Sequence, residues 1–357
     1  MPERGRLPRT LIALGVALAA GAALLFGAPA RSGAPQPLAL ATAWPDAQRG
    51  SVPSRLPDGS EYSPALFLDA RTSAGTVQSV DGRTLRLILR QSDGSIRQLR
   101  KVPSEQRAPF AALTGSGDTL VWVESVDGRQ QLWRAGLRGN APARMITAEV
   151  GAMRLRDSQY DLVIADAMVH WVAAGPGERT EFRSVPLTGG RVTVERAAGS
   201  WSLSAWPWAV DGQTSARGVT ALRDLTTGRT AATPSAARAI TACSPSWCRM
   251  VSLNADGYAR IELAHPDGSA RRKVAEGAVA TAIEDVAVLD RFEVFGRVGP
   301  QSELSGNQEL LVHDLRTRRT VLVSPDAGNV GYRGGVLWWS TGDQSSFVRN
   351  SLDLRTV

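Results

Sequence analysis

The side chains that most often carry out catalysis or bind metals are few in this chain and are far apart. Its three histidines are His170, His265 and His313. No two of them have the short spacing with which a helix or hairpin presents a pair of zinc ligands. The chain has no Gly-x-Ser-x-Gly nucleophile elbow, no calcium-binding loop and no glycine-rich phosphate loop. The sequence therefore predicts no catalytic residue, no metal ligand and no cofactor.

Tryptophan is the residue type best suited to a binding role, with ten tryptophans beside seven phenylalanines and four tyrosines. Trp201, Trp206 and Trp208 lie within eight residues. Trp206 and Trp208 flank Pro207 and are expected to share one face of a strand, and a proline places such a strand near a loop or an edge. Two interpretations follow: packing between neighbouring sheets, or an aromatic platform that contacts a sugar or a protein side chain.

The two cysteines, Cys243 and Cys248, enclose the turn-forming sequence Ser-Pro-Ser-Trp. Redox-active pairs usually have two intervening residues and begin a helix, whereas this pair has four and strand-like flanks. The spacing favours a structural disulfide across a hairpin over two free thiols or a redox pair. A structural disulfide indicates an oxidising compartment.

The amino terminus agrees with that compartment. Arg4, Arg6 and Arg9 precede residues 11–28, which carry no polar side chain, and residues 28–30 read Ala-Pro-Ala. Positive charge before an apolar run is typical of a secretory signal or of a single membrane anchor. Residues 1–30 are therefore predicted to be one or the other, and the membrane is contacted only through residues 11–28 if they remain attached. Both interpretations place the remainder outside the cytoplasm.

The formal charge of +7 does not indicate a nucleic-acid partner. Such a partner requires basic residues gathered on one face. The longest basic runs, 271–273 and 316–319, lie beside predicted turns with acidic residues nearby. Hydrophobic residues make up 43% of the chain and charged residues 21%, which excludes a disordered or collagen-like protein.

The pattern of strands and turns predicts that an all-β fold positions the tryptophans and cysteines. Residues 31–61 are rich in proline and are expected to be a linker, while residues 62–357 alternate short apolar runs with Gly, Asp, Asn and Pro turns. Seven apolar runs recur at steps of 38 to 48 residues, beginning at 76, 120, 168, 206, 249, 292 and 336. Six of them precede a predicted hairpin. That period matches a four-stranded propeller blade, so we predict a β-propeller of seven blades, with six as the alternative.

Two of the hairpins, 186–194 (PLTGGRVTV) and 266–274 (PDGSARRKV), carry a family resemblance. In these segments and in the repeat as a whole, residues 62–357 resemble the TolB-like β-propellers. The resemblance implies the propeller fold more than it implies an activity.

The last repeat, from residue 329, has room for about three strands. Propellers usually complete such a blade with a strand from the other terminus, because this removes an exposed sheet edge. We expect residues 61–70 to supply that strand. The polar insert 299–308, GPQSELSGNQ, is a second candidate contact surface beside the tryptophans, since loops on a rigid scaffold commonly bind.

The sequence thus favours a non-catalytic, extracytoplasmic propeller that binds or scaffolds an envelope protein or a cell-wall polymer. One alternative is an enzyme of the lactonase or glycan-cleaving type, with a site at the mouth of the central channel. This alternative predicts acidic or histidine side chains clustered there. They would come from several blades, so a search for linear motifs would not find them. Another alternative is a structural cap with no ligand.

Overall fold

The computed structural model describes residues 36–105, 109–212, 218–234, 238–300, 302–342 and 347–357. Contacts group residues 38–357 into one compact unit, which is separate from residues 1–37. The expected export segment, residues 1–30, lies outside the described residues. Within the described part, no helix is long and apolar enough to cross a bilayer.

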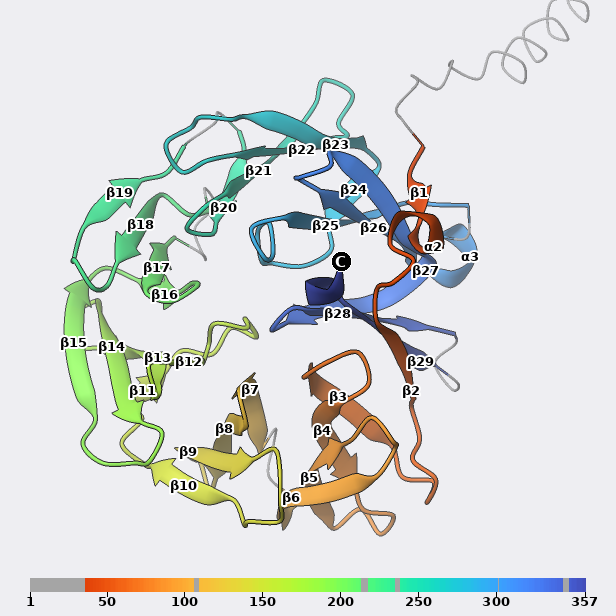
Figure 1. Ribbon diagram of the computed structural model, residues 1–357. Coiled ribbons are helices and arrows are strands. Elements are labelled where there is room, and N and C mark those ends of the chain that lie inside the picture. The colour runs from red at the N-terminus through yellow and green to blue at the C-terminus, as the bar shows by residue number, and fades with distance from the viewer. Residues whose placement is uncertain (1–35, 106–108, 213–217, 235–237, 301, 343–346) are drawn as a thin grey trace, which may run out of the picture. The chain divides into compact units, whose positions relative to one another are not determined.

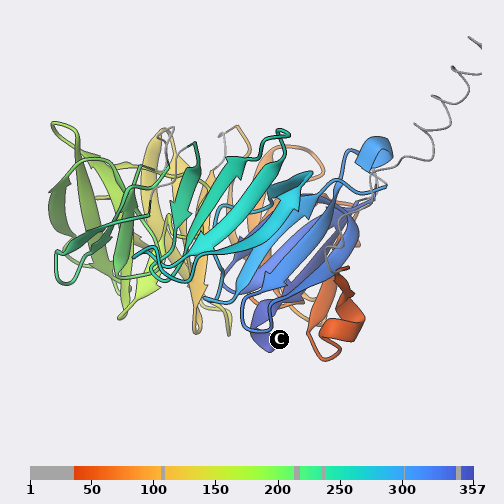
Figure 2. The same cartoon turned by 90° about the horizontal axis from the view of Figure 1, so that it is seen from above.

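The second unit is a β-propeller. Its described strands form seven antiparallel blades that follow one another around a common centre (Figure 1). Seen from the side, the strands run between two faces where the connecting loops gather (Figure 2). The predicted all-β fold and its seven four-stranded blades are confirmed.

The first five blades are separate sheets with the innermost strand first in sequence. Blade 1 contains β3 (Tyr62–Phe67), β4 (Ser73–Gln78), β5 (Thr84–Arg90) and β6 (Ile96–Pro103). Blade 2 contains β7 (Phe110–Ser116), β8 (Thr119–Val126), β9 (Arg129–Gly136) and β10 (Arg144–Thr147). Blade 3 contains β11 (Ala152–Met153), β12 (Val163–Ala165), β13 (Met168–Gly175), β14 (Arg179–Pro186) and β15 (Thr193–Ala198).

Blade 4 contains β16 (Trp201–Leu203), β17 (Trp208–Asp211), β18 (Ala221–Asp224) and β19 (Thr230–Ala232). Blade 5 contains β20 (Ile240–Cys243), β21 (Cys248–Leu253), β22 (Ala259–Ala264) and β23 (Arg272–Gly277). In blade 3, β11 and β12 both pair with β13, so they share the innermost position.

Blades 6 and 7 are joined by one long strand, β27 (Arg319–Arg333). Blade 6 adds β24 (Val279–Thr281), β25 (Phe292–Arg297) and β26 (Gln308–Asp314), with the helical turn α3 (Ser302–Ser305) between the last two. Blade 7 adds β28 (Val336–Thr341), β29 (Val348–Asp353) and β2 (Arg49–Pro53), and the chain ends in a 3-10 turn, η1 (Leu354–Thr356). The first part of β27 pairs with β26 and the last part with β28, so one strand is outermost in blade 6 and innermost in blade 7.

The seven apolar runs are the second strands of the blades, and blade packing explains their composition. In β8, Leu120 and Trp122 pack against blade 1, while Val121 and Val123 pack against blade 3. Successive residues of a strand face opposite sides, so a strand between two neighbouring blades must be apolar on both faces. This burial makes the runs continuous rather than alternating.

The ring is closed by β2, which pairs antiparallel with β29 from Arg49–Leu352 to Pro53–Val348. Val52 is fully buried against the core of blade 1. The backbone at Gly50 passes so close to blade 1 that a Cβ there would lie 1.9 Å from the carbonyl oxygen of Ala70. The closing strand is thus wedged between the last blade and the first.

This closure corrects two predictions. Residues 61–70 do not complete the last blade, because residues 62–67 are the innermost strand β3 of blade 1. Residues 38–61, expected to be linker, belong to the propeller unit: β1 (Leu38–Ala39) pairs with β27, and α2 (Leu40–Ala43) leads to the buried Trp44. The many prolines of this stretch leave only short elements, and these gain their stability from partners at the far end of the chain.

Candidate functional site

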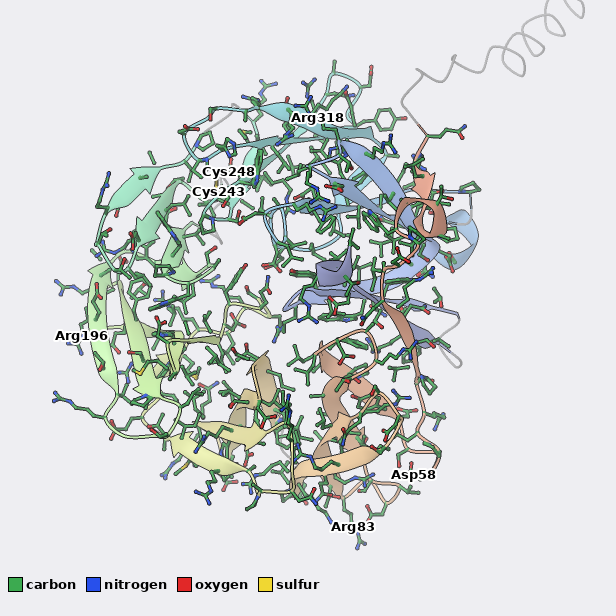
Figure 3. The ribbon with its side chains drawn as sticks, in the orientation of Figure 1. Asp58, Arg83, Arg196, Cys243, Cys248 and Arg318 are labelled. Atoms are coloured by element: carbon green, nitrogen blue, oxygen red, sulfur yellow. A yellow bond between two sulfur atoms is a disulfide. The ribbon has the colours of Figure 1, made fainter. Side chains whose placement is uncertain are left out.

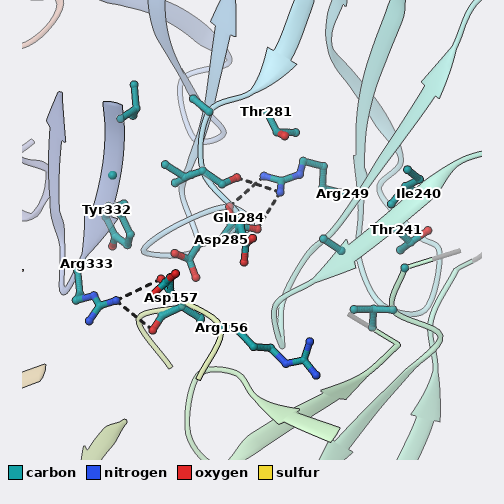
Figure 4. A pocket seen from close by; sticks show the side chains of 18 of the residues that line it. Arg156, Asp157, Ile240, Thr241, Arg249, Thr281, Glu284, Asp285, Tyr332 and Arg333 are labelled. Atoms are coloured by element: carbon teal, nitrogen blue, oxygen red, sulfur yellow. Dashed lines mark hydrogen bonds between the residues drawn. The ribbon is translucent and has the colours of Figure 1, made fainter. Parts of the chain in front are cut away.

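A pocket of about 790 Å³ lies where the inner strands of blades 5, 6 and 7 face the centre of the ring (Figure 4). We call it the axial pocket. Its lining is mixed, with apolar residues such as Ile240 and Val330 beside polar and charged ones. The polar and charged residues come from blades 3, 5, 6 and 7: Arg156, Asp157, Thr241, Arg249, Thr281, Glu284, Asp285, Tyr332 and Arg333. Both signs of charge are therefore present, so the acidic residues that the enzyme alternative requires do occur at the channel.

One wall of the axial pocket is the segment 154–162, which joins the two short inner strands of blade 3. Arg333 of blade 7 donates from Nη2 to the carbonyl oxygens of Asp157 (3.3 Å) and Ser158 (3.2 Å). The backbone N–H of Gly334 donates to Oε1 of Gln159 (3.1 Å). These bonds tie the blade 3 segment to blade 7 and fix the wall of the pocket.

The opposite wall, residues 283–285, is held by Arg249. Its Nη2 donates to the carbonyl oxygens of Ile283 (3.2 Å) and Glu284 (2.8 Å), and its Nη1 donates to that of Asp285 (3.0 Å). Nη1 also forms a 2.8 Å ion pair with Glu293, whose side chain is fully buried. The guanidinium therefore acts as a structural clamp.

Two carboxyl groups at the axial pocket and beside it have shifted pKa values. Burial raises the pKa of Asp285 to about 6, against the opposing effects of a hydrogen bond from Gln159 and the charges of Arg249 and Arg333. Burial likewise raises the pKa of Asp161 to about 6, although its Oδ2 accepts the backbone N–H of Arg156 (2.8 Å). Both groups therefore exchange protons near neutral pH.

Arg156 differs from the other two arginines of the axial pocket. Within the described part of the chain its guanidinium forms no hydrogen bond or ion pair, and its Nε is buried without a partner. Figure 4 shows its side chain extending away from Arg333. A cation held in a recess without a partner is a donor available to a ligand.

The three predicted aromatic contacts do not form one surface. Trp201 is buried in the core between blades 3 and 4, and its indole N–H donates to the carbonyl oxygen of Ala198 (2.7 Å). Trp206 lies in the turn before β17 and stacks on His170 at 3.6 Å between ring centroids, so it does not share a strand face with Trp208. Trp208 packs against the next core cluster, beside the disulfide. A ligand contact by Trp201, Trp206 or Trp208 stays a prediction.

The three histidines lie apart, and each has its own surroundings. His265 contacts the carbonyl oxygen of Ser246 through Nδ1 (2.9 Å), and His313 contacts Oγ1 of Thr320 (3.0 Å). His170 is buried, as expected for a core residue. Over the described ranges, no group of three or more His, Cys, Asp or Glu side chains is arranged to hold a metal ion.

The disulfide between Cys243 and Cys248 is present (Figure 3). It joins paired residues of β20 and β21, and the turn between them is closed by a bond from the N–H of Ser244 to the carbonyl oxygen of Trp247 (2.7 Å). Its first cysteine directly follows Ala242, which lines the axial pocket. The bridge fits an oxidising compartment, and it closes the blade 5 hairpin beside the axial pocket.

The basic residues that Figure 3 labels, Arg83, Arg196 and Arg318, lie at three separate places on the periphery of the ring. The insert 299–308 contains α3 and lies beside a second pocket, of about 400 Å³. Sequence reasoning singled out this insert but missed the axial pocket.

No known protein-family model matches the chain, and no curated protein matches its sequence. Similar solved structures include an uncharacterised protein of Listeria monocytogenes, with 9% identity over 78% of this chain and 88% of that one and a TM-score of 0.50. They also include an oligogalacturonate lyase in complex with manganese (10% identity, 87% and 98% coverage, TM-score 0.49) and TolB of Acinetobacter baumannii (15%, 63% and 53%, TM-score 0.35).

The likeness to the Listeria protein agrees with the β-propeller fold of this chain. At such an identity it carries the fold alone.

Proposed function

We propose that this protein is an extracytoplasmic, non-catalytic β-propeller that binds an envelope protein or a cell-wall polymer through the axial pocket. The observation that supports the proposal most directly is Arg156, a cation with an unpartnered guanidinium in a pocket of about 790 Å³. Pockets of this size with a few converging polar groups are typical of ligand sites.

The rest of the axial pocket is preorganised. Arg249 and Arg333 are bound to backbone carbonyl groups of the two walls, so they hold the walls in place and are not themselves free for a ligand. A rigid frame lowers the conformational entropy that a ligand must overcome on binding. This arrangement supports recognition by shape and hydrogen bonding.

The compartment is supported by two independent features. The Cys243–Cys248 bridge is typical of proteins folded outside the cytoplasm. The basic and apolar amino terminus, residues 1–30, has the composition of an export signal or anchor.

Photo-crosslinking in intact cells tests the proposal. A benzoylphenylalanine replaces Thr281, an exposed neutral residue of the axial pocket, and in a control replaces Val80, which is 87% exposed on blade 1. We expect an adduct with a wall fragment or one envelope protein at Thr281 only, and its loss when Arg156→Gln is added. Arg138→Gln, which changes an exposed arginine on blade 2, should leave the adduct unchanged.

Equal adducts at residues 281 and 80 would contradict a site in the axial pocket. No adduct at either position would favour the structural cap.

The second candidate function is a propeller enzyme of the lactonase or glycan-cleaving type. It is favoured by one observation: Asp285 and Asp161 have pKa values raised to about 6, which suits a general acid or base. Turnover of a panel of lactones and wall glycans, abolished by Asp285→Asn, would establish it. Binding without turnover in wild-type protein would exclude it.

A further inference from the structure

A second pocket, of about 400 Å³, lies next to the axial pocket, between blades 6 and 7. Thr281, Ala282 and Val330 line both. These three shared residues place the two pockets side by side, and we call the pair the groove. We call the second pocket the side groove; it lies at the base of the insert 299–308.

The side groove differs in chemistry from the axial pocket. Its lining is rich in glycine and carboxamide residues: Gly296, Gly306, Asn307, Gln308, Gly328 and Asn329. Its charged residue, Glu309, is bound to Arg297 at 2.6 Å. The side groove therefore presents hydrogen-bonding groups without an unpaired charge.

The three carboxamides are available to a ligand. With the residues that the structure describes, the side chains of Asn307, Gln308 and Asn329 form no hydrogen bond. Each can donate two hydrogen bonds and accept two. Leu310, the largest apolar residue of the lining, is buried at 1% exposure, so this side chain offers a ligand no apolar contact.

Two glycines make room for these carboxamides. A Cβ at Gly328 would lie 2.6 Å from Oδ1 of Asn307, and one at Gly296 would lie 2.0 Å from Oε1 of Gln308. The φ angles of both glycines lie outside the left-handed region, so alanine is compatible with the backbone there. An alanine at either position would instead push a carboxamide out of place.

We propose that the groove binds an uncharged carbohydrate chain, with one part in the axial pocket and the following sugar units in the side groove. This inference rests on the proposed function and specifies its ligand. Sugar hydroxyl and acetamido groups both donate and accept hydrogen bonds, as the carboxamides do. Uncharged sugar units in the side groove also avoid the cost of removing a charge from water, since that part of the groove has no free countercharge.

Calorimetric titration with N-acetylglucosamine oligomers of one to six units tests the inference on the purified 38–357 unit and on the full chain. We expect the affinity to rise by about tenfold or more between the short and the long oligomers. Gly328→Ala and, as a second variant, Asn307→Ala should bind short oligomers as the wild type does and lose this gain. Arg156→Gln should weaken binding at every length.

Gly136→Ala is the matched control, because this strand glycine of blade 2 also has an ordinary φ and its Cβ would meet a neighbour only at 3.4 Å. Urea midpoints of all variants report whether they are folded. An affinity that does not change with length, or an equal loss for all oligomers in Gly328→Ala, would overturn the inference while leaving the axial pocket as a binding site.

A hexapeptide of alanine and glutamate serves as the competing probe. Binding of this peptide in place of the sugars would assign the groove to a polypeptide and overturn the inference. Absence of binding to either probe, together with no crosslink at Thr281, would instead overturn the proposed function itself.

Discussion

Glu293→Ala should destabilise the propeller more than any loss of a surface ion pair. Glu293 lies on β25 and is fully buried, and it pairs with Arg249, whose side chain is 5% exposed. One carboxylate oxygen accepts from Arg249 (2.8 Å) and the other accepts the N–H of Ala287 (2.9 Å). The substitution leaves a buried guanidinium without its counterion.

Removing one partner of a buried pair typically costs about 3–5 kcal/mol, because the remaining charge stays out of water. Arg249 keeps its bonds to three backbone carbonyl groups, so we expect the lower part of that range. The change is measured as the shift of the urea midpoint at constant m-value. Glu61→Ala is the control: the Arg55–Glu61 pair is 2.9 Å apart but 58% and 75% exposed, and its loss should cost less than about 1 kcal/mol.

A loss of stability in Glu293→Ala no larger than in Glu61→Ala would refute this reasoning. The paired variant Arg249→Met with Glu293→Leu provides a further check. It should recover part of the lost stability, because neither charge remains buried. It should not recover ligand binding, since the 283–285 wall loses its clamp.

Three further predictions concern stability. Replacing Cys243 and Cys248 by serine should lower the free energy of unfolding by about 2 kcal/mol, seen in the urea midpoint; an unchanged midpoint would show that the bridge constrains nothing. Val52→Ala should cost about 2 kcal/mol by emptying the seam between the closing strand and blade 1, and a neutral result in calorimetry would argue against closure by β2. Asp285 has a folded pKa of about 6 against an ordinary value of 3.8, so the folded state binds more protons between these values. The stability of the wild type relative to Asp285→Asn should therefore fall as pH rises from about 4 through about 6; urea midpoints that keep a constant difference would contradict this.

The repeat made the fold predictable from the sequence. Each second strand lies between two neighbouring blades and is buried on both faces, as at residues 120–123. It therefore appears in the sequence as an apolar run, and the regular spacing of these runs revealed the repeat. The hairpins were marked by Gly and Asp at turns with positive φ, such as Gly94 and Gly268. The close cysteine spacing sufficed to predict the disulfide, because a hairpin brings its two ends together.

The closing strand and the axial pocket lacked any such local signal. In β2 only Val52 is buried, and its partner strand lies about 300 residues away in sequence. The pocket gathers Arg156, Thr281 and Tyr332 from three blades, and none of them belongs to a recognisable motif. One weak signal for Arg156 was present in the sequence: it is a charged residue in a long segment that lacks the alternating pattern of a β-strand. Its lack of a hydrogen-bond partner, however, is a property of the folded state.

Hydrogen exchange of the full chain, with and without the ligand captured at residue 281, tests the central claim that the axial pocket is the binding site. We expect slower amide exchange in residues 154–162, 281–285 and 328–333, which surround the pocket and the side groove. Slower exchange confined to outer strands such as β19 (Thr230–Ala232), with no change in these three segments, would contradict it.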